Sequence, residues 1–83
     1  MTPFELLIEL LGWIASILII AAYALNSLGK ISVKSSPYLW ANLIGGIFFI
    51  INTFYHQAYP SGVLNIIWVV IAAVSLLKKS KSN

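Results

Sequence analysis

Three long apolar runs, separated by two short polar stretches, constrain this chain more than any other feature. The runs extend over residues 4–27, 37–56 and 61–77. A helix needs about 20 apolar residues to cross the hydrocarbon core of a bilayer. Of the 83 residues, 60% are hydrophobic and 8% are charged, whereas soluble domains carry about 25% charged residues. A soluble fold this short could not bury so much apolar surface. We therefore expect an all-α membrane protein with a bundle of three transmembrane helices.

The residues at the ends of these runs are typical of helix termini. Pro3 suits a first helical turn and Gly29 a helix stop. Ser35 and Ser36 are two capping candidates for the second helix, and Pro37 suits its first helical position. The chain is expected to form a single unit over residues 1–83, with a polar tail at residues 78–83 and no internal repeat. The first run is too long for a signal peptide and lacks a basic start, so we expect it to be retained.

The positions of the lysines predict the orientation of the chain in the membrane. Cytoplasmic connections carry an excess of basic residues. The N-terminal segment and the connection between the second and third helices have no lysine. The basic residues lie in the first connection and in the tail, namely Lys30, Lys34, Lys78, Lys79 and Lys81. We therefore expect a multi-pass protein with its N-terminus outside and its C-terminus in the cytoplasm.

Small and polar residues recur at three- and four-residue spacing along one face of each expected helix. The three lines are Glu5, Glu9, Gly12, Ser16, Ile19, Tyr23 and Asn26; Asn42, Gly45 or Gly46, Phe49, Asn52 and His56; and Ser61, Asn65, Trp68, Ala72 and Ser75. Inside a membrane, such residues usually face protein or water.

Two interpretations of these lines are open. In the first, Gly12, Ser16, Gly45 and Gly46 let helices approach closely, and each Asn only bonds a neighbouring helix. In the second, the lines meet around a cavity where a solute is contacted by Asn65, Asn52 and Phe49. The lines could meet within one chain or only across a dimer.

Glu9 and His56 also allow two interpretations. An intramembrane carboxylate often marks a proton path, so the pair are candidates for proton coupling. Alternatively, Glu9 is stabilised near a helix start by the helix dipole and headgroup water, and His56 is an interfacial residue.

Known catalytic patterns are missing from the sequence. A single histidine, with no cysteine, is too little for a zinc site, and there is no aspartate for a Ser-His-Asp triad, although a glutamate could replace it. There is also no glycine-rich phosphate loop. Five lysines without a basic stripe do not form a nucleic-acid surface. We expect no enzyme, no cofactor, no metal and no nucleic-acid partner.

Three segments, in order, resemble the SemiSWEETs, the bacterial half-transporters of the PQ-loop superfamily. The similarity extends from about Gly12 to Lys79 and rests on Gly12-Trp13-Ile14-Ala15, Lys30-Ile31-Ser32 and Pro60-Ser61-Gly62-Val63-Leu64-Asn65. It implies a parallel homodimer of three-helix units in a bacterial inner membrane, around a central path. The sequence looks more similar still to short, uncharacterised bacterial membrane proteins within or near that superfamily.

The resemblance also implies roles for particular positions. A Trp on the second helix and an Asn on the third contact sugar in SemiSWEETs, and these positions correspond to Phe49 and Asn65. A Tyr of some members corresponds to Asn52. The Pro-Gln pair of the first helix would fall at Leu25 and Asn26, so the proline that is thought to help this helix bend is missing. The scaffold therefore carries over better than the sugar substrate or the hinge.

Three functions are consistent with the sequence. The first is a transporter or facilitator of a small polar solute, working as a homodimer by alternating access around a midplane site. The second is a non-transporting subunit or assembly factor of a larger membrane complex, because the chain is small and lacks the proline and the Trp. The third, which rests on Glu9 and His56, is a proton-coupled carrier.

Overall fold

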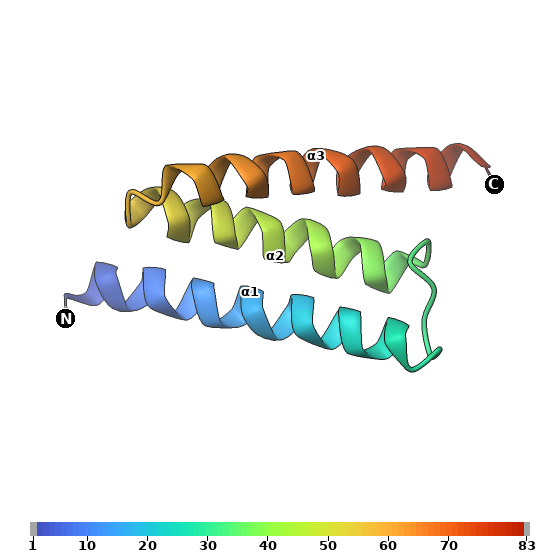
Figure 1. Cartoon of the computed structure of the whole chain (residues 1–83), viewed down its shortest axis with the longest axis horizontal. Helices are drawn as coiled ribbons and strands as arrows, with labels where there is room; N and C mark the ends of the chain where they lie inside the picture. Colours follow the sequence, from blue (N-terminus) through green and yellow to red (C-terminus); the bar gives the residue numbers. More distant parts are fainter. Residues whose placement is uncertain (1, 83) are drawn as a thin grey trace.

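The chain forms three long α-helices joined by two short connections (Figure 1). The computed structural model describes residues 2–82, and the side chains of residues 2–79. The helices are α1 (Pro3–Ser27), α2 (Ser36–Tyr55) and α3 (Tyr59–Ser82). Each contains a segment long and apolar enough to cross a membrane. The prediction of an all-helical chain with three such helices is confirmed, and it fits a multi-pass membrane protein.

The third helix is longer than its apolar run. It begins at Tyr59 and continues through the lysines to Ser82, whereas we expected a polar tail from residue 78; Asn83 lies outside the described residues. Leu and Lys are good helix formers, and lysines near a helix C-terminus interact favourably with the helix dipole. The helix therefore continues past the end of the apolar segment.

The three helices lie side by side and antiparallel, with α2 in the middle (Figure 1). Both outer helices pack against α2, and within residues 2–82 no Cα atom of α1 lies within 8 Å of one in α3. The N-terminus and the α2–α3 connection lie at one end of the molecule, here named the N-terminal end. The α1–α2 connection and the C-terminus lie at the other, here named the lysine end. Lys30, Lys34, Lys78 and Lys79 all belong to segments at the lysine end.

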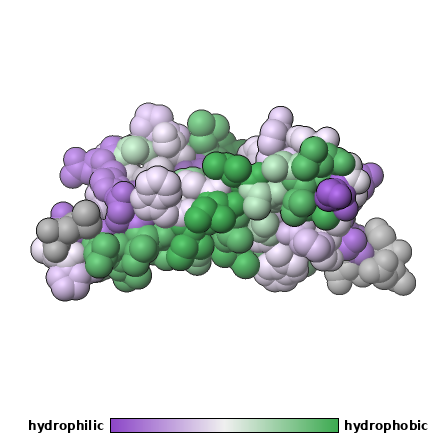
Figure 2. Space-filling view, turned by 90° about the horizontal axis from the view of Figure 1, so that it is seen from below, coloured by the Kyte–Doolittle hydropathy of each residue, from purple (hydrophilic) through white to green (hydrophobic). Residues whose placement is uncertain are grey.

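The surface has the banded polarity expected of a chain that crosses a bilayer. Seen from below the view of Figure 1, hydrophobic residues extend through the middle and along much of the length, and the most hydrophilic residues gather toward both ends (Figure 2). Many large apolar side chains of the helix interiors are exposed, such as Trp13, Ile20 and Leu64. This distribution is explained if the middle of the molecule faces lipid tails and not water.

The starts of α1 and α2 are capped by side chains. The Thr2 hydroxyl accepts a hydrogen bond from the Glu5 amide, and the Glu5 carboxylate accepts one from the Thr2 amide, which is a complete capping box. On α2, the Ser35 hydroxyl accepts from the Tyr38 amide and Pro37 lies in the first turn. Of the two capping candidates, Ser35 is therefore the cap, and Pro37 is the second residue of the helix, one position later than predicted.

The ends of α1 and α2 share one geometry but use different residues. In both, the two residues that follow the C-cap donate back to the last turn: Gly29 and Lys30 to α1, and Gln57 and Ala58 to α2. The first of each pair has a positive φ, 76° at Gly29 and 60° at Gln57. Glycine adopts this conformation freely, but a residue with a Cβ is strained there by roughly 1–2 kcal/mol.

This difference predicts stability changes of opposite sign. Gly29→Ala should lower the free energy of unfolding and Gln57→Gly should raise it, each by up to about 1 kcal/mol, because strain is added in one case and removed in the other. Equilibrium unfolding in mixed micelles, followed by circular dichroism, measures both changes. Gln57→Ala keeps the Cβ and is the control, with little expected change. A loss of stability in Gln57→Gly would contradict the explanation.

Two adjacent glycines let α2 pack closely against both neighbours. A Cβ at Gly45 would lie 2.8 Å from Ile19 Cγ1 on α1, and a Cβ at Gly46 would lie 2.6 Å from Val69 Cγ2 on α3. Both distances are too short for real atoms. The two glycines therefore mark the two directions in which α2 contacts its partners, about 100° apart around the helix axis.

Candidate functional site

A first pocket lies between α1 and α2, toward the N-terminal end. It has a volume of about 210 Å³ and is lined by Glu9, Gly12, Trp13, Ser16, Phe49 and Asn52. These residues come from the predicted lines of the first and second helices, apart from Trp13. The structure therefore brings together Phe49 and Asn52, two of the three residues proposed to contact a solute, and adds Glu9.

Most of the donors in this pocket are used within the chain. The Asn52 amide group donates to the Ile8 carbonyl of α1 at 3.0 Å, and the Ser16 hydroxyl donates to the Gly12 carbonyl at 2.9 Å. The Trp13 indole donates to one carboxylate oxygen of Glu9 at 3.3 Å. The Asn52 side-chain oxygen and the second Glu9 oxygen are left as acceptors, and one N–H of the Asn52 amide is left as a donor, so acceptors outnumber donors. The pocket therefore suits a group that donates hydrogen bonds.

The same contacts explain why residue 12 is a glycine. A Cβ there would lie 2.7 Å from the Asn52 side-chain nitrogen. The missing side chain lets the Asn52 amide reach the α1 backbone, so this Asn fastens two helices and also lines the pocket.

A second pocket lies between α2 and α3, toward the lysine end. It has a volume of about 330 Å³, and its lining includes Tyr38, Asn42, Trp68 and Ser75. The Trp68 indole donates to the Asn42 side-chain oxygen at 2.9 Å, and the Asn42 amide donates to the Tyr38 carbonyl at 2.8 Å. Asn42 is only 5% exposed. Both the oxygen and the nitrogen of its buried side chain therefore have a hydrogen-bond partner, as buried polar groups require.

The two pockets open on the same side of the molecule. Asn42 and Phe49 are seven residues apart on α2, almost two turns, and so point in nearly the same direction. That direction lies midway between Gly45, which faces α1, and Gly46, which faces α3. The polar and aromatic residues of both pockets therefore lie on one side of the molecule, here named the polar face, in the angle between α1 and α3. The lines of all three helices contribute to it within a single chain, although no Cα atoms of α1 and α3 lie within 8 Å of each other.

Asn65 is the predicted solute-contacting residue that lines neither pocket. It lies one turn before Trp68 on α3, between Gly62 and Val69, which both face α2. Its side chain is partly exposed, and no hydrogen bond joins its amide to any other residue within residues 2–82. Its hydrogen-bonding groups are accessible to a ligand.

The remaining predicted residues have local roles. The Asn26 amide donates to the Ile31 carbonyl at 2.9 Å and fixes the α1–α2 connection. His56 hydrogen-bonds the Asn52 carbonyl through Nδ1 at 2.9 Å; because a carbonyl only accepts, that nitrogen carries the proton. No hydrogen bond or ion pair joins Glu9 to His56 in the part of the chain that the structure describes.

Comparison with known proteins gives one match. A model of an uncharacterised family matches residues 8–83. The chain belongs to this family. No curated protein and no solved structure matches the sequence. The resemblance to SemiSWEETs and the roles it implies therefore stay predictions.

The Asn42–Trp68 pair was not among the predicted site residues. Both lie on the predicted polar lines, but a line only says that its residues share a face. Their pairing depends on how far α3 is shifted along α2, which helical spacing does not contain.

The pair predicts a measurable coupling between α2 and α3. Asn42→Ala and Trp68→Phe should each destabilise the fold, and together by less than their sum, with a coupling energy of about 0.6–1.7 kcal/mol. A double-mutant cycle measured by unfolding in mixed micelles gives this energy. In the matched control cycle, Trp40→Phe replaces Trp68→Phe, and the coupling should be near zero. Equal coupling in both cycles would contradict the assignment.

Proposed function

We propose that the chain is a protomer of a homodimeric transporter or facilitator for a small polar solute. The observation that carries this proposal is the polar face. An ionised side chain at the centre of a membrane helix costs about 2.5–3.5 kcal/mol, so polar groups there face protein or water. The face lies open in a single chain, and a second copy is the simplest protein that could cover it. Two opposed polar faces would enclose a path between them.

The candidate contact residues lie at similar depths, which supports a common site. Glu9, Phe49 and Asn65 are each six residues, or about 9 Å, from the helix ends at the N-terminal end. Ring contacts show that these ends are level, because Phe4 lies beside Tyr55 at 5.4 Å and Phe54 lies beside Tyr59 at 5.9 Å between ring centres. A solute bound by these residues would sit on the N-terminal-end side of the midplane.

The chemistry of the α1–α2 pocket limits the class of solute. Free acceptors on Glu9 and Asn52 suit a solute with hydroxyl or N–H groups. The rings of Trp13 and Phe49 suit the apolar face of a sugar or, beside the Glu9 carboxylate, a small ammonium group. We therefore propose a hydroxyl-rich or ammonium-bearing solute.

Flux into proteoliposomes tests this proposal. Uptake from a panel of mono- and disaccharides and small amines should be saturable. Phe49→Leu and Asn65→Ala should each reduce it by about tenfold, the equivalent of one good contact. Phe48→Leu is the matched control, because Phe48 lines neither pocket and points about 100° away from Phe49.

The outcomes of this experiment separate the alternatives. No uptake across the panel by folded protein, or a strictly monomeric protein in the bilayer, would contradict transport by a homodimer. Loss of uptake in Phe49→Leu but not in Asn65→Ala would restrict the site to the α1–α2 pocket. Flux that ignores both a pH gradient and Glu9→Gln would remove the proton-coupled form of the proposal.

The proposed orientation places the N-terminal end outside and the lysine end in the cytoplasm of the cell (inner) membrane. The sequence has no cysteine, so single cysteines can be introduced directly. A membrane-impermeant maleimide added to intact cells should label Tyr59→Cys and leave Ser32→Cys unlabelled until the membrane is opened. The opposite pattern would reverse the orientation, and labelling of both positions would mean dual insertion.

A second candidate function is a non-transporting subunit of a larger membrane complex. It is favoured by the continuity of α1, which has no proline between Pro3 and its end, and by the Asn26 contact that fixes its last turn. A rigid α1 suits a docking face better than a moving gate. Purification from native membranes discriminates, since stoichiometric recovery of a different protein would support this candidate and recovery of the chain alone would oppose it.

A further inference from the structure

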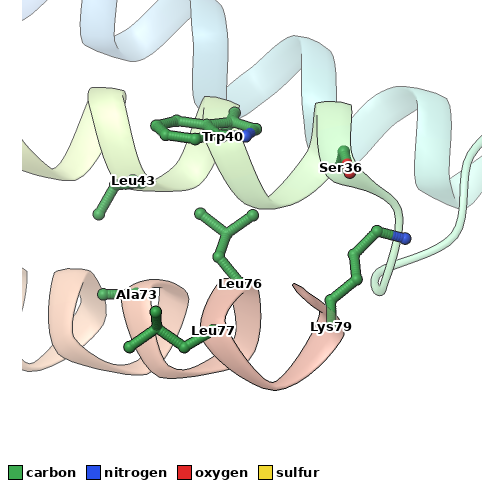
Figure 3. Close-up of a pocket in the computed structure, with 7 residues that line it drawn as sticks. All are labelled: Ser36, Trp40, Leu43, Ala73, Leu76, Leu77 and Lys79. Carbon is green, nitrogen blue, oxygen red and sulfur yellow. The ribbon is translucent and has the colours of Figure 1, made fainter. Parts of the chain in front are cut away.

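A third pocket lies on the side of the molecule away from the polar face. It is a groove between α2 and α3 at the lysine end, with a volume of about 590 Å³ (Figure 3). Its walls are apolar, and its mouth at the lysine end is polar. The lining residues are Ser36, Trp40, Leu43, Ala73, Leu76, Leu77 and Lys79.

The groove faces away from the surface proposed to meet a second copy. Trp40 is two residues from Asn42 and points about 160° from it around the axis of α2. Asn42 lines the polar face, so Trp40 and Leu43 lie on the back of the helix. In the proposed dimer, this back surface faces the lipid.

The groove has its polar and apolar parts in the order found in a phospholipid. Lys79 extends from α3 toward the start of α2, where Ser36 lies (Figure 3). The ammonium group of Lys79 and the hydroxyl of Ser36 make no hydrogen bond or ion pair with any described residue. Leu43 lies seven residues, or about 10 Å, further along α2 toward the membrane interior. Trp40, 52% exposed, lies between these levels, as interfacial tryptophans do.

We propose that this groove binds one anionic phospholipid. The phosphate is held by Lys79 and Ser36 at the membrane surface, and one acyl chain lies along Leu43, Ala73 and Leu76. Charge complementarity favours an anionic lipid over a zwitterionic one, because all the lysines belong to segments at this end and both acidic residues belong to the N-terminal half of α1. Basic pockets between transmembrane helices bind anionic head groups in this way.

Quenching of Trp40 fluorescence by brominated lipids tests the site in bilayers. The protein is placed in phosphatidylcholine vesicles with a fixed fraction of either brominated phosphatidylglycerol or brominated phosphatidylcholine. Trp13→Phe and Trp68→Phe leave Trp40 as the one reporter, with folding checked by circular dichroism. Brominated phosphatidylglycerol should quench more strongly. Lys79→Gln should reduce this preference by roughly fivefold, the effect of one lysine near the membrane surface.

Lys30→Gln is the matched control, because Lys30 has the same charge at the same end but does not line the groove. It should leave the preference largely intact. Equal loss in both variants would mean attraction by the whole basic surface and would overturn the site. Weak quenching by both lipids would mean that protein covers Trp40, such as a second copy, and would also overturn it. Neither result depends on whether the chain transports a solute.

Discussion

The close approach of both outer helices to the middle of α2 is the contact on which the rest of the structure depends. It requires two adjacent residues without side chains, Gly45 for α1 and Gly46 for α3. Adjacent residues on a helix point about 100° apart, so the outer helices meet α2 at an angle and not from opposite sides. Lipid tails provide no hydrophobic drive for helix association, so close packing and interhelical hydrogen bonds must hold the bundle together. A side chain at either glycine would remove the first of these.

The same angle creates the polar face. Asn42 and Phe49 of α2 point between Gly45 and Gly46, where Phe49 is partly exposed and Asn42 is buried with its side-chain oxygen bonded to Trp68 of α3. Each outer helix adds polar or aromatic residues to the edge of the angle, Glu9 and Ser16 from α1 and Trp68 and Ser75 from α3. Two interhelical hydrogen bonds join the helices at this face: Asn52 of α2 donates to Ile8 of α1, and Trp68 of α3 donates to Asn42 of α2. The placement of Gly45 and Gly46 on α2 therefore explains both the packing of the three helices and the polar face.

Much of the fold could be predicted from the sequence because it depends on local physics. Apolar length gives three helices, the Ser-Ser-Pro sequence at residues 35–37 gives the start of α2 to within a residue, and three- and four-residue spacing gives a polar line on each helix. The order of the helices in space could not be predicted, because it depends on which glycine faces which neighbour. The end of α3 was misplaced because its last turns continue beyond the apolar segment.

In the candidate site, too, the features set by local spacing could be predicted, and those set by packing between helices could not. Spacing placed Phe49 and Asn52 on one face, and the structure adds that they share a pocket with Glu9. The Asn42–Trp68 bond was missed because it depends on the longitudinal shift between α2 and α3. That shift is set by side-chain fit, with Gly62 facing the ring of Phe54 at one level and Gly46 facing Val69 at another. Such fits involve residues far apart in the sequence, and no single-helix pattern contains them.

The two sides of α2 and α3 face different environments, and this limits how the chain can assemble. The polar face holds a carboxylate, two asparagines and three tyrosine or tryptophan side chains. The back groove is apolar except at its mouth. A dimer formed through the back would bury Leu43, Leu76 and Leu77, which gain little by leaving lipid tails of equal polarity. It would leave the polar face in hydrocarbon. A dimer formed through the polar face removes that penalty and leaves the apolar groove in lipid. For the proposed dimer, the transfer free energy of the polar groups, more than the shape of the apolar surface, therefore favours contact through the polar face.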